Sequence, residues 1–300
     1  MKTVKGLHEK MGTFENANTS FHQAARCKRY TNEVLAFSMV KEEELLRATE
    51  EIQNLTYRQG EYKIFKVFEP KERLIMALPF YDRVVQHMIC NAIQPVFENG
   101  FYYHSYACRS GKGMHAASDT LYQWVYETEV KQGLRMYAFK GDISKYFASI
   151  PHDKLKDENR RYIGDKKALM LMDDIIDHNG ILPDGVGIPV GNLTSQLFAN
   201  VYGNKLDKFC KHVLHIPYFV RYMDDFIILS DDLEQLKEWV KRIEEFLENE
   251  MLLHINPKST ILYAGNGIDF CGYINYADHK KVRKSSSRKL KQDVKAYELG

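Results

Sequence analysis

The spacing of apolar and polar residues predicts mainly helices in the first half of the chain. Helical periodicity runs from Ser20 to about Gln59 and returns over residues 83–98 and 114–130. Only residues 61–70, EYKIFKVFEP, alternate in the way that a strand does. The first half is therefore expected to be mainly helical.

The second half alternates strands with helices. A strand over 134–143 ends in an acid, and a loop with two glycines then leads into a helix within 187–209. Thr194 or Ser195 is expected to cap that helix. Two β-rich runs flank residues 223–225 as a hairpin, an amphipathic helix follows over 232–250, and strand residues lie within 253–263 and 268–276. The order predicts an α+β fold, an antiparallel sheet with helices packed on one face.

Bulk composition is that of a soluble globular protein. Of the 300 residues, 44% are hydrophobic and 27% charged, which suits one large domain or two or three packed subdomains. No apolar run approaches the roughly 20 residues of a membrane helix, and the N-terminus lacks a signal-peptide core. A cytoplasmic protein without membrane contact is expected. The five cysteines form no C-x-x-C pair, which favours reduced thiols.

Positive charge is concentrated at the end of the chain. Net charge is only +2, but residues 277–300 hold eight Lys or Arg against three acids. This pattern indicates either a polyanion partner or a solvated helix end, and composition does not decide between them.

Three aspartates carry the candidate chemistry. Asp142 ends one predicted strand, and Asp224 and Asp225 lie in the predicted hairpin turn. Aspartate is common in turns for purely local reasons. The runs that flank this turn, however, are more apolar than those beside an ordinary exposed loop. Hard divalent cations need clustered oxygen ligands, and two ions about 3.5–4 Å apart support nucleotidyl transfer. If the strands are neighbours, the three carboxylates converge at one edge.

Around these acids the chain resembles the reverse transcriptases. RYMDDFIIL resembles their catalytic hairpin, and other stretches agree in order between about Tyr62 and Arg288. These are PKERLIMALPFYDRVVQH (fingers), GDISKYFASI (first palm motif), GIPVGNLTSQLFANVYGNKLD (nucleotide pocket), NPKST (the lysine near the triphosphate) and IDFCGY (primer grip). The resemblance implies a right-hand polymerase fold with fingers, palm and a short or truncated thumb.

The pocket sequence VGNLTSQ, with SYACRSGKG and VRKSSSRK, resembles the enzymes of diversity-generating retroelements. That resemblance implies copying of a template-repeat RNA from a DNA or RNA primer with dNTPs, and errors opposite template adenines. It also implies a basic, oligomeric accessory variability determinant protein as partner. The alternatives are an abortive-infection, retron-type or group II intron-like reverse transcriptase with a defence or mobility role, and a catalytically silent RNA-binding module.

The resemblance assigns the metal site to Asp142, Asp224 and Asp225, with the backbone carbonyl of Ile143 as a further ligand. Two Mg²⁺ ions are implied, with Mn²⁺ as a substitute.

Nucleotide binding is assigned by the same resemblance. Phe147 would exclude a ribose 2′-hydroxyl, and Val190 would leave base selection loose, because apolar contacts discriminate less well than polar ones. The remaining dNTP-binding residues are Lys71, Arg73, Gly191, Gln196 and Lys258, and a surface charge is the alternative for each cation. The template and primer residues are Arg83, Gln86, Arg109, Lys112, Tyr222, Met223 and Gly272.

The expected organisation is an N-terminal helical extension at 1–60, fingers at 61–133 and a palm at 134–276. Residues 150–190 are expected to belong partly to the fingers and partly to a palm insertion, and 277–300 to begin a thumb.

Overall fold

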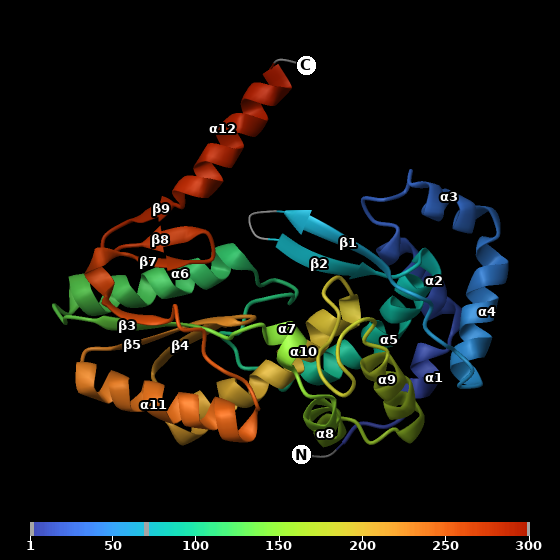
Figure 1. Cartoon of the computed structure of the whole chain (residues 1–300), viewed down its shortest axis with the longest axis horizontal. Helices are drawn as coiled ribbons and strands as arrows, with labels where there is room; N and C mark the ends of the chain where they lie inside the picture. The colour runs from blue at the N-terminus through green and yellow to red at the C-terminus, as the bar shows by residue number, and fades with distance from the viewer. Residues whose placement is uncertain (1–2, 69–71, 299–300) are drawn as a thin grey trace. The chain divides into compact units, whose positions relative to one another are not determined.

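The computed structural model describes residues 3–68 and 72–298 as a mixture of helices and antiparallel sheets, drawn in Figure 1. The chain forms two units, each assembled from separated stretches of sequence. The first unit comprises residues 1–101 and 145–202, and the second comprises residues 102–144 and 203–300. Among the described residues, no helix is long and apolar enough to cross a membrane.

The first unit is organised around α5 (Phe80–Glu98), which buries apolar residues on several sides. Val84, Met88 and Ile93 have no exposed surface, because neighbouring helices cover this long apolar helix. The helices α1 (Leu7–Met11), α2 (Phe14–Ala24) and α3 (Asn32–Met39) pack against it. The same unit also contains α4 (Lys41–Gln53), α7 (Tyr146–Ser149), α8 (His152–Tyr162) and α9 (Lys166–Asp177).

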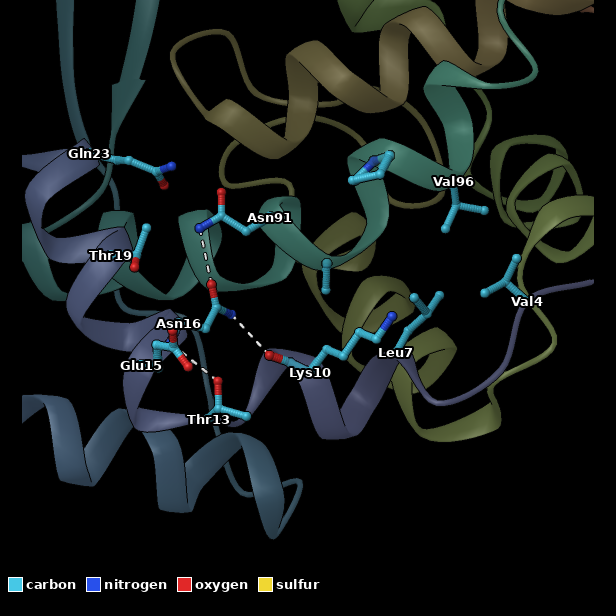
Figure 2. Close-up of a pocket in the computed structure, with 12 residues that line it drawn as sticks. Val4, Leu7, Lys10, Thr13, Glu15, Asn16, Thr19, Gln23, Asn91 and Val96 are labelled. Carbon is cyan, nitrogen blue, oxygen red and sulfur yellow. Dashed lines mark hydrogen bonds between the residues drawn. The ribbon is translucent and has the colours of Figure 1, made fainter.

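Asn16 ties three of these helices together beside a groove of about 580 Å³ (Figure 2). Its Nδ2 donates to the carbonyls of Lys10 (3.2 Å) and Met11 (3.0 Å), and to that of Met88 in α5 (2.9 Å). Asn91 completes the link by donating to the Asn16 amide oxygen at 3.0 Å. Two of the polar side chains of this groove, Asn16 and Asn91, therefore join α1, α2 and α5.

A two-stranded hairpin also belongs to the first unit. Strand β1 (Lys63–Phe68) pairs antiparallel with β2 (Glu72–Ala77), so that Ile64 faces Met76 and Val67 faces Arg73. The expected strand at 61–70 is therefore present, and most of its residues are exposed.

The second unit contains a four-stranded antiparallel sheet in the order β4-β5-β3-β6. The strands are β3 (Tyr137–Asp142), β4 (Tyr218–Tyr222), β5 (Asp225–Ser230) and β6 (Thr260–Tyr263). Helix α6 (Met114–Val125) packs on the face that carries Ala138, Ile227 and Leu229. Helix α11 (Leu233–Glu250) covers the other face, as Figure 1 shows. The expectation that helices cover one face only is corrected, because both faces of this sheet are apolar.

A smaller sheet and the basic helix complete the second unit. Strands β7 (Ile268–Phe270), β8 (Tyr273–Asn275) and β9 (Lys280–Val282) form three antiparallel strands. Helix α12 (Lys284–Glu298) follows, and none of its described residues is buried.

Two local expectations need correction. The helical stretch from Ser20 to Gln59 is broken into α2, α3 and α4, with Cys27 in a left-handed conformation (φ 61°) at the first break. Helix α10 (Leu193–Lys208) begins one residue before Thr194, so neither Thr194 nor Ser195 precedes it as a cap. Both errors arise because periodicity identifies a helix better than it identifies the ends of that helix.

A fully buried arginine holds the β4–β5 hairpin in place. Arg221, near the end of β4, pairs with the buried Asp207 of α10 through two contacts of 2.6 Å. Its Nη1 donates to the carbonyl of Met223 at 2.9 Å, and its Nη2 donates to the hydroxyl of Ser105 at 3.1 Å. Met223 lies in the two-residue turn with a φ of 60°, a conformation that costs a non-glycine residue roughly 1–2 kcal/mol. The guanidinium thus stabilises the strained turn from inside the unit.

We expect Arg221→Met to lower the free energy of unfolding by about 3–5 kcal/mol, because it leaves the Asp207 carboxylate buried without its partner. Arg221→Met combined with Asp207→Leu should recover most of that loss, since an apolar pair avoids the desolvation of two charges. Chemical denaturation monitored by circular dichroism measures both. Lys237→Met, which removes an exposed pair with Glu234, is the matched control and should change stability by less than about 1 kcal/mol. If Arg221→Met alone were as stable as Lys237→Met, the stabilising role assigned to Arg221 would be wrong.

Candidate active site

Three carboxylates meet at one end of the four-stranded sheet. Asp142 is the last residue of β3 and lies directly opposite Asp225, the first residue of β5. Side chains alternate along a strand, so both aspartates project from the face that also carries Ala138 and Ile227. Residues opposite one another in an antiparallel pair have Cβ atoms about 4.5–5.5 Å apart. The sequence prediction that these acids converge is confirmed for Asp142 and Asp225.

The third carboxylate belongs to the turn between β4 and β5. Tyr222 pairs with Asp225, which leaves Met223 and Asp224 as the two turn residues. The backbone carbonyl of Asp224 accepts a hydrogen bond from the N–H of Ile143 at 3.2 Å. This bond joins the hairpin turn to the end of β3, so the three acids occupy two segments that are directly bonded to each other.

Gly141 allows this close approach. A Cβ atom at residue 141 would meet the ring of Phe226, its partner on β5, at 2.3 Å. The aromatic ring therefore lies across the glycine, and a side chain here would force β3 and β5 apart immediately beside Asp142 and Asp225.

The sequence did not reveal that Asn256 and Ser259 form hydrogen bonds with Asp142. Asn256 donates its Nδ2–H to Oδ2 of Asp142 at 2.6 Å, and its backbone N–H donates to the Asp142 carbonyl at 2.7 Å. The hydroxyl of Ser259 accepts from the backbone N–H of Asp142 at 3.1 Å. The NPKST stretch predicted only Lys258, whose backbone N–H bonds to Asn256 while its side chain is exposed. An asparagine before proline was the available signal, but it is equally typical of an ordinary turn.

The carboxylates of Asp142, Asp224 and Asp225 repel one another. Burial, followed by repulsion from Asp224 and Asp142, raises the pKa of Asp225 to about 6. Lys140 and Arg283 act in the opposite direction, although Arg283 is also paired with Asp269 at 2.5 Å. The site therefore holds more negative charge than its own cations neutralise.

This donor set suits a hard divalent cation. Within residues 3–68 and 72–298, no three acidic, histidine or cysteine side chains are already arranged around a metal position. Mg²⁺ does not require such an arrangement, because it keeps several waters and is usually held by one or two carboxylates plus substrate phosphates. Asp142, Asp224 and Asp225 would hold the ion, and the excess negative charge at Asp225 favours its binding. The role of the Ile143 carbonyl stays a prediction.

The other predicted residues of the second unit have different surroundings. Gly272 lies in the β7–β8 turn with a φ of 82° and accepts from the N–H of Arg283 at 2.9 Å. Arg109 donates to the carbonyls of Tyr102 (2.8 Å) and Ser105 (2.7 Å), and Lys112 donates to that of Tyr103 (2.9 Å). Both cations therefore stabilise their own loop, and their expected contacts with template phosphates stay predictions.

In the first unit, the predicted nucleotide residues lie on neighbouring segments. The carbonyl of Phe147 accepts from the N–H of Ile188 at 2.8 Å, two residues before Val190. Gly191 follows at the surface, and Gln196 begins the second turn of α10. Arg73 is exposed on β2, and Lys71 lies outside the described residues.

Arg83 and Gln86 both lie on α5 but are used differently. Arg83 pairs with Glu33 of α3, while its Nε is buried without a partner. Gln86 is only 1% exposed and donates to the Oε1 of Gln59 at 3.1 Å. Its side chain braces the unit, and its expected contact with a template stays a prediction.

We expect Asp225→Asn to stabilise the metal-free protein. Because the folded state raises the pKa of Asp225 above its ordinary value, the wild type loses stability as the pH rises from about 4 through about 6. The variant lacks this loss. Its free energy of unfolding should therefore exceed that of the wild type only slightly at pH 4, and by up to about 3 kcal/mol above pH 6.5. Thermal unfolding in EDTA at both pH values measures it. Asp231→Asn, an exposed carboxylate of the same unit, is the control. An advantage that does not change with pH would contradict the proposed repulsion.

Three sequence relatives each match part of the chain. Protein YkfC of Escherichia coli (strain K12) is 25% identical over 251 residues, which cover 68% of this chain and 62% of that protein. An uncharacterized 91 kDa protein in the cob intron of Schizosaccharomyces pombe is 29% identical over 137 residues, 44% of this chain and 16% of that protein. The putative COX1/OXI3 intron 2 protein of Saccharomyces cerevisiae is 22% identical over 254 residues, 64% of this chain and 29% of that protein. The chain thus spans less than two thirds of each relative.

Solved structures with the same fold include telomerases. Apo telomerase from Candida tropicalis, truncated from the C-terminal domain, superposes with a TM-score of 0.54 at 14% identity, over 76% of this chain and 55% of that one. Telomerase from Candida albicans with a fragment of telomeric RNA gives 0.53 at 13% identity, over 84% and 50%. The predicted α+β fingers and palm fold is therefore confirmed. The family model for reverse transcriptase (RNA-dependent DNA polymerase) matches residues 66–275, and the chain belongs to the reverse transcriptase family.

Proposed function

We propose that this protein is an RNA-directed DNA polymerase that extends a primer on an RNA template with dNTPs. The observation that carries the proposal is the placement of Asp142, Asp224 and Asp225 on two bonded segments at one end of an antiparallel sheet. Membership of the reverse transcriptase family supports the same chemistry. Bound divalent ions, Mg²⁺ or Mn²⁺, would activate the primer hydroxyl and stabilise the leaving pyrophosphate.

The remaining tasks fall to side chains of this chain. Asn256 holds one oxygen of Asp142 and so orients the carboxylate. Arg73 and Lys258, both exposed, carry positive charge for the phosphates of the incoming nucleotide. The half-buried Phe147 presents a bulky ring that excludes a ribose 2′-hydroxyl. The basic helix α12 contacts the template–primer backbone through salt-dependent phosphate interactions.

We further propose that the polymerase is error-prone and serves a diversity-generating retroelement, with a template-repeat RNA and a basic accessory protein as partners. The support is Val190 in the sequence VGNLTSQ. Valine offers shape without hydrogen bonds, so a mismatched nucleotide leaves no polar group of this side chain unpaired.

An intron-type or defence-related reverse transcriptase is the second candidate. The names of two relatives place them in introns, which favours a mobility role. The two candidates differ in fidelity, since only the first requires frequent errors opposite adenine.

Single-nucleotide primer extension on an RNA template with Mg²⁺ tests the proposal. Each dNTP is offered alone opposite each template base, with and without the basic accessory protein. We expect extension with misincorporation concentrated opposite adenine. Asp224→Ala with Asp225→Ala should lower the rate by roughly 10³-fold or more, because metal-assisted charge stabilisation is worth several kcal/mol.

The matched control is Asp231→Ala, which removes an exposed carboxylate of the same unit and should leave the rate unchanged. Accurate extension at all four bases would favour the intron-type or defence candidate over diversification. Absence of extension under every condition would favour an RNA-binding role.

Val190→Gln should reduce misincorporation opposite adenine several-fold, because an amide in the pocket loop penalises a nucleotide that leaves it unpaired. The ratio of kcat/KM for wrong and right nucleotides measures the effect. Val213→Gln, at an exposed site of the second unit, is the control. An unchanged error spectrum in the Val190 variant would remove the role proposed for this valine.

A further inference from the structure

A tyrosine at the base of the β1–β2 hairpin makes three hydrogen bonds through one hydroxyl. Tyr62, the residue before β1, accepts from Nε2 of Gln59 at 2.7 Å and from Nδ2 of Asn192 at 2.9 Å, and donates to the carbonyl of His178 at 2.9 Å. Burial raises the pKa of Tyr62 to about 12, so the hydroxyl keeps the proton that it donates. Two of its partners are distant in the chain, since His178 lies 116 positions from Tyr62 and Asn192 lies 130 positions from it.

The network is anchored in the core of the first unit. Gln59, which donates to Tyr62, accepts from the buried amide of Gln86 on α5. Asn192 is itself only 4% exposed. A buried amide that loses its partner costs about 1–3 kcal/mol, so each member of the network restrains the next.

The same hairpin holds the loop from its other strand. The backbone N–H of Met76, on β2, donates to the carbonyl of Val190 at 3.1 Å. Gly191 adopts a φ of 121°, and a Cβ there would meet Ile75 and Met76 at 3.2 Å. Because Ile64 faces Met76 in the hairpin, Tyr62 and Met76 both lie at its base. Residues 190–192 are therefore held at two points, by Tyr62 just before β1 and by Met76 of β2.

We propose that Tyr62 is a positioning residue for the loop of residues 189–192, and that it fixes the nucleotide-selecting Val190 to the base of the β1–β2 hairpin. The effect on nucleotide selection rests on the proposed function, whereas the restraint of the loop does not. A shift of the hairpin base would move the carbonyl of Val190 and the amide of Asn192 together, since Val190 is bonded to β2 and Asn192 to the residue that precedes β1.

Tyr62→Phe tests the proposal, because it removes the hydroxyl and keeps the ring that packs 5.5 Å from His178 and against Gly180. Hydrogen–deuterium exchange should increase in a peptide covering residues 189–193. In primer extension, KM for the dNTP should rise roughly fivefold or more with kcat nearly unchanged, as expected when one hydrogen bond that orders a binding loop is lost. Misincorporation should change in the same variant.

Tyr81→Phe is the matched control. Tyr81 is also half-buried in the first unit and donates its hydroxyl hydrogen bond to Glu51 at 2.7 Å, away from the loop. It should alter neither exchange at 189–193 nor KM. Equal changes in both variants would mean that any lost tyrosine hydroxyl loosens the unit, which would overturn the assignment to Tyr62.

Asn192→Ala and the double variant with Tyr62→Phe provide a second test. If Tyr62 acts through Asn192, the effects of the two substitutions on exchange at 189–193 should be less than additive, because the two residues share one interaction. Effects that add would overturn the proposal. Thermal unfolding of each variant checks that it is folded.

Exchange and extension separate this inference from the proposed function. Increased exchange at 189–193 without any extension by the wild type would support the positioning role and reject the polymerase. Normal extension by the wild type with unchanged exchange and KM in Tyr62→Phe would keep the polymerase and reject the positioning role.

Discussion

The buried ion pair between Arg221 and Asp207 is the interaction on which the acidic site depends. A bidentate contact of 2.6 Å neutralises both charges inside the second unit, and the remaining guanidinium nitrogen holds the carbonyl of Met223. A buried pair adds little net stability compared with apolar residues of similar volume. Its contribution here is geometric, because it holds a methionine at a φ of 60° immediately before Asp224. Arg221, in the strand that precedes the turn, thus supports the turn that carries Asp224 and leads into Asp225.

The acids themselves work against folding. Burial and the charges of Asp224 and Asp142 raise the pKa of Asp225, which means that the ionised site destabilises the metal-free protein. The surrounding structure compensates through close packing of Gly141 under Phe226 and through the two bonds from Asn256 to Asp142. Clustered carboxylates that lower the stability of the metal-free protein are typical of functional sites, where the cluster serves to bind a cation.

In the first unit, uncharged groups hold the loop of residues 189–192 in place. Its pocket loop holds no buried charge, and amides and a tyrosine hydroxyl join it to a hairpin and to α5. A fully satisfied polar network specifies one arrangement, because each broken bond leaves a buried group unpaired. The loop that contains Val190 is therefore rigid in its attachment even though Val190 itself makes no polar side-chain contact.

The sequence by itself determined the strands β3 to β6 with α10 and α11 between them, the family and the three acids, because each depends on local periodicity or on residues contiguous in the chain. It did not reveal the contacts of Asp142 with Asn256 or of Tyr62 with Asn192, which join positions 114 and 130 residues apart. It did not reveal that Arg109 and Lys112 bond to carbonyls of their own loop, and their expected template contacts stay predictions. Only the tertiary structure decides such pairings, since a side chain's partner depends on which distant segments folding brings within hydrogen-bonding distance.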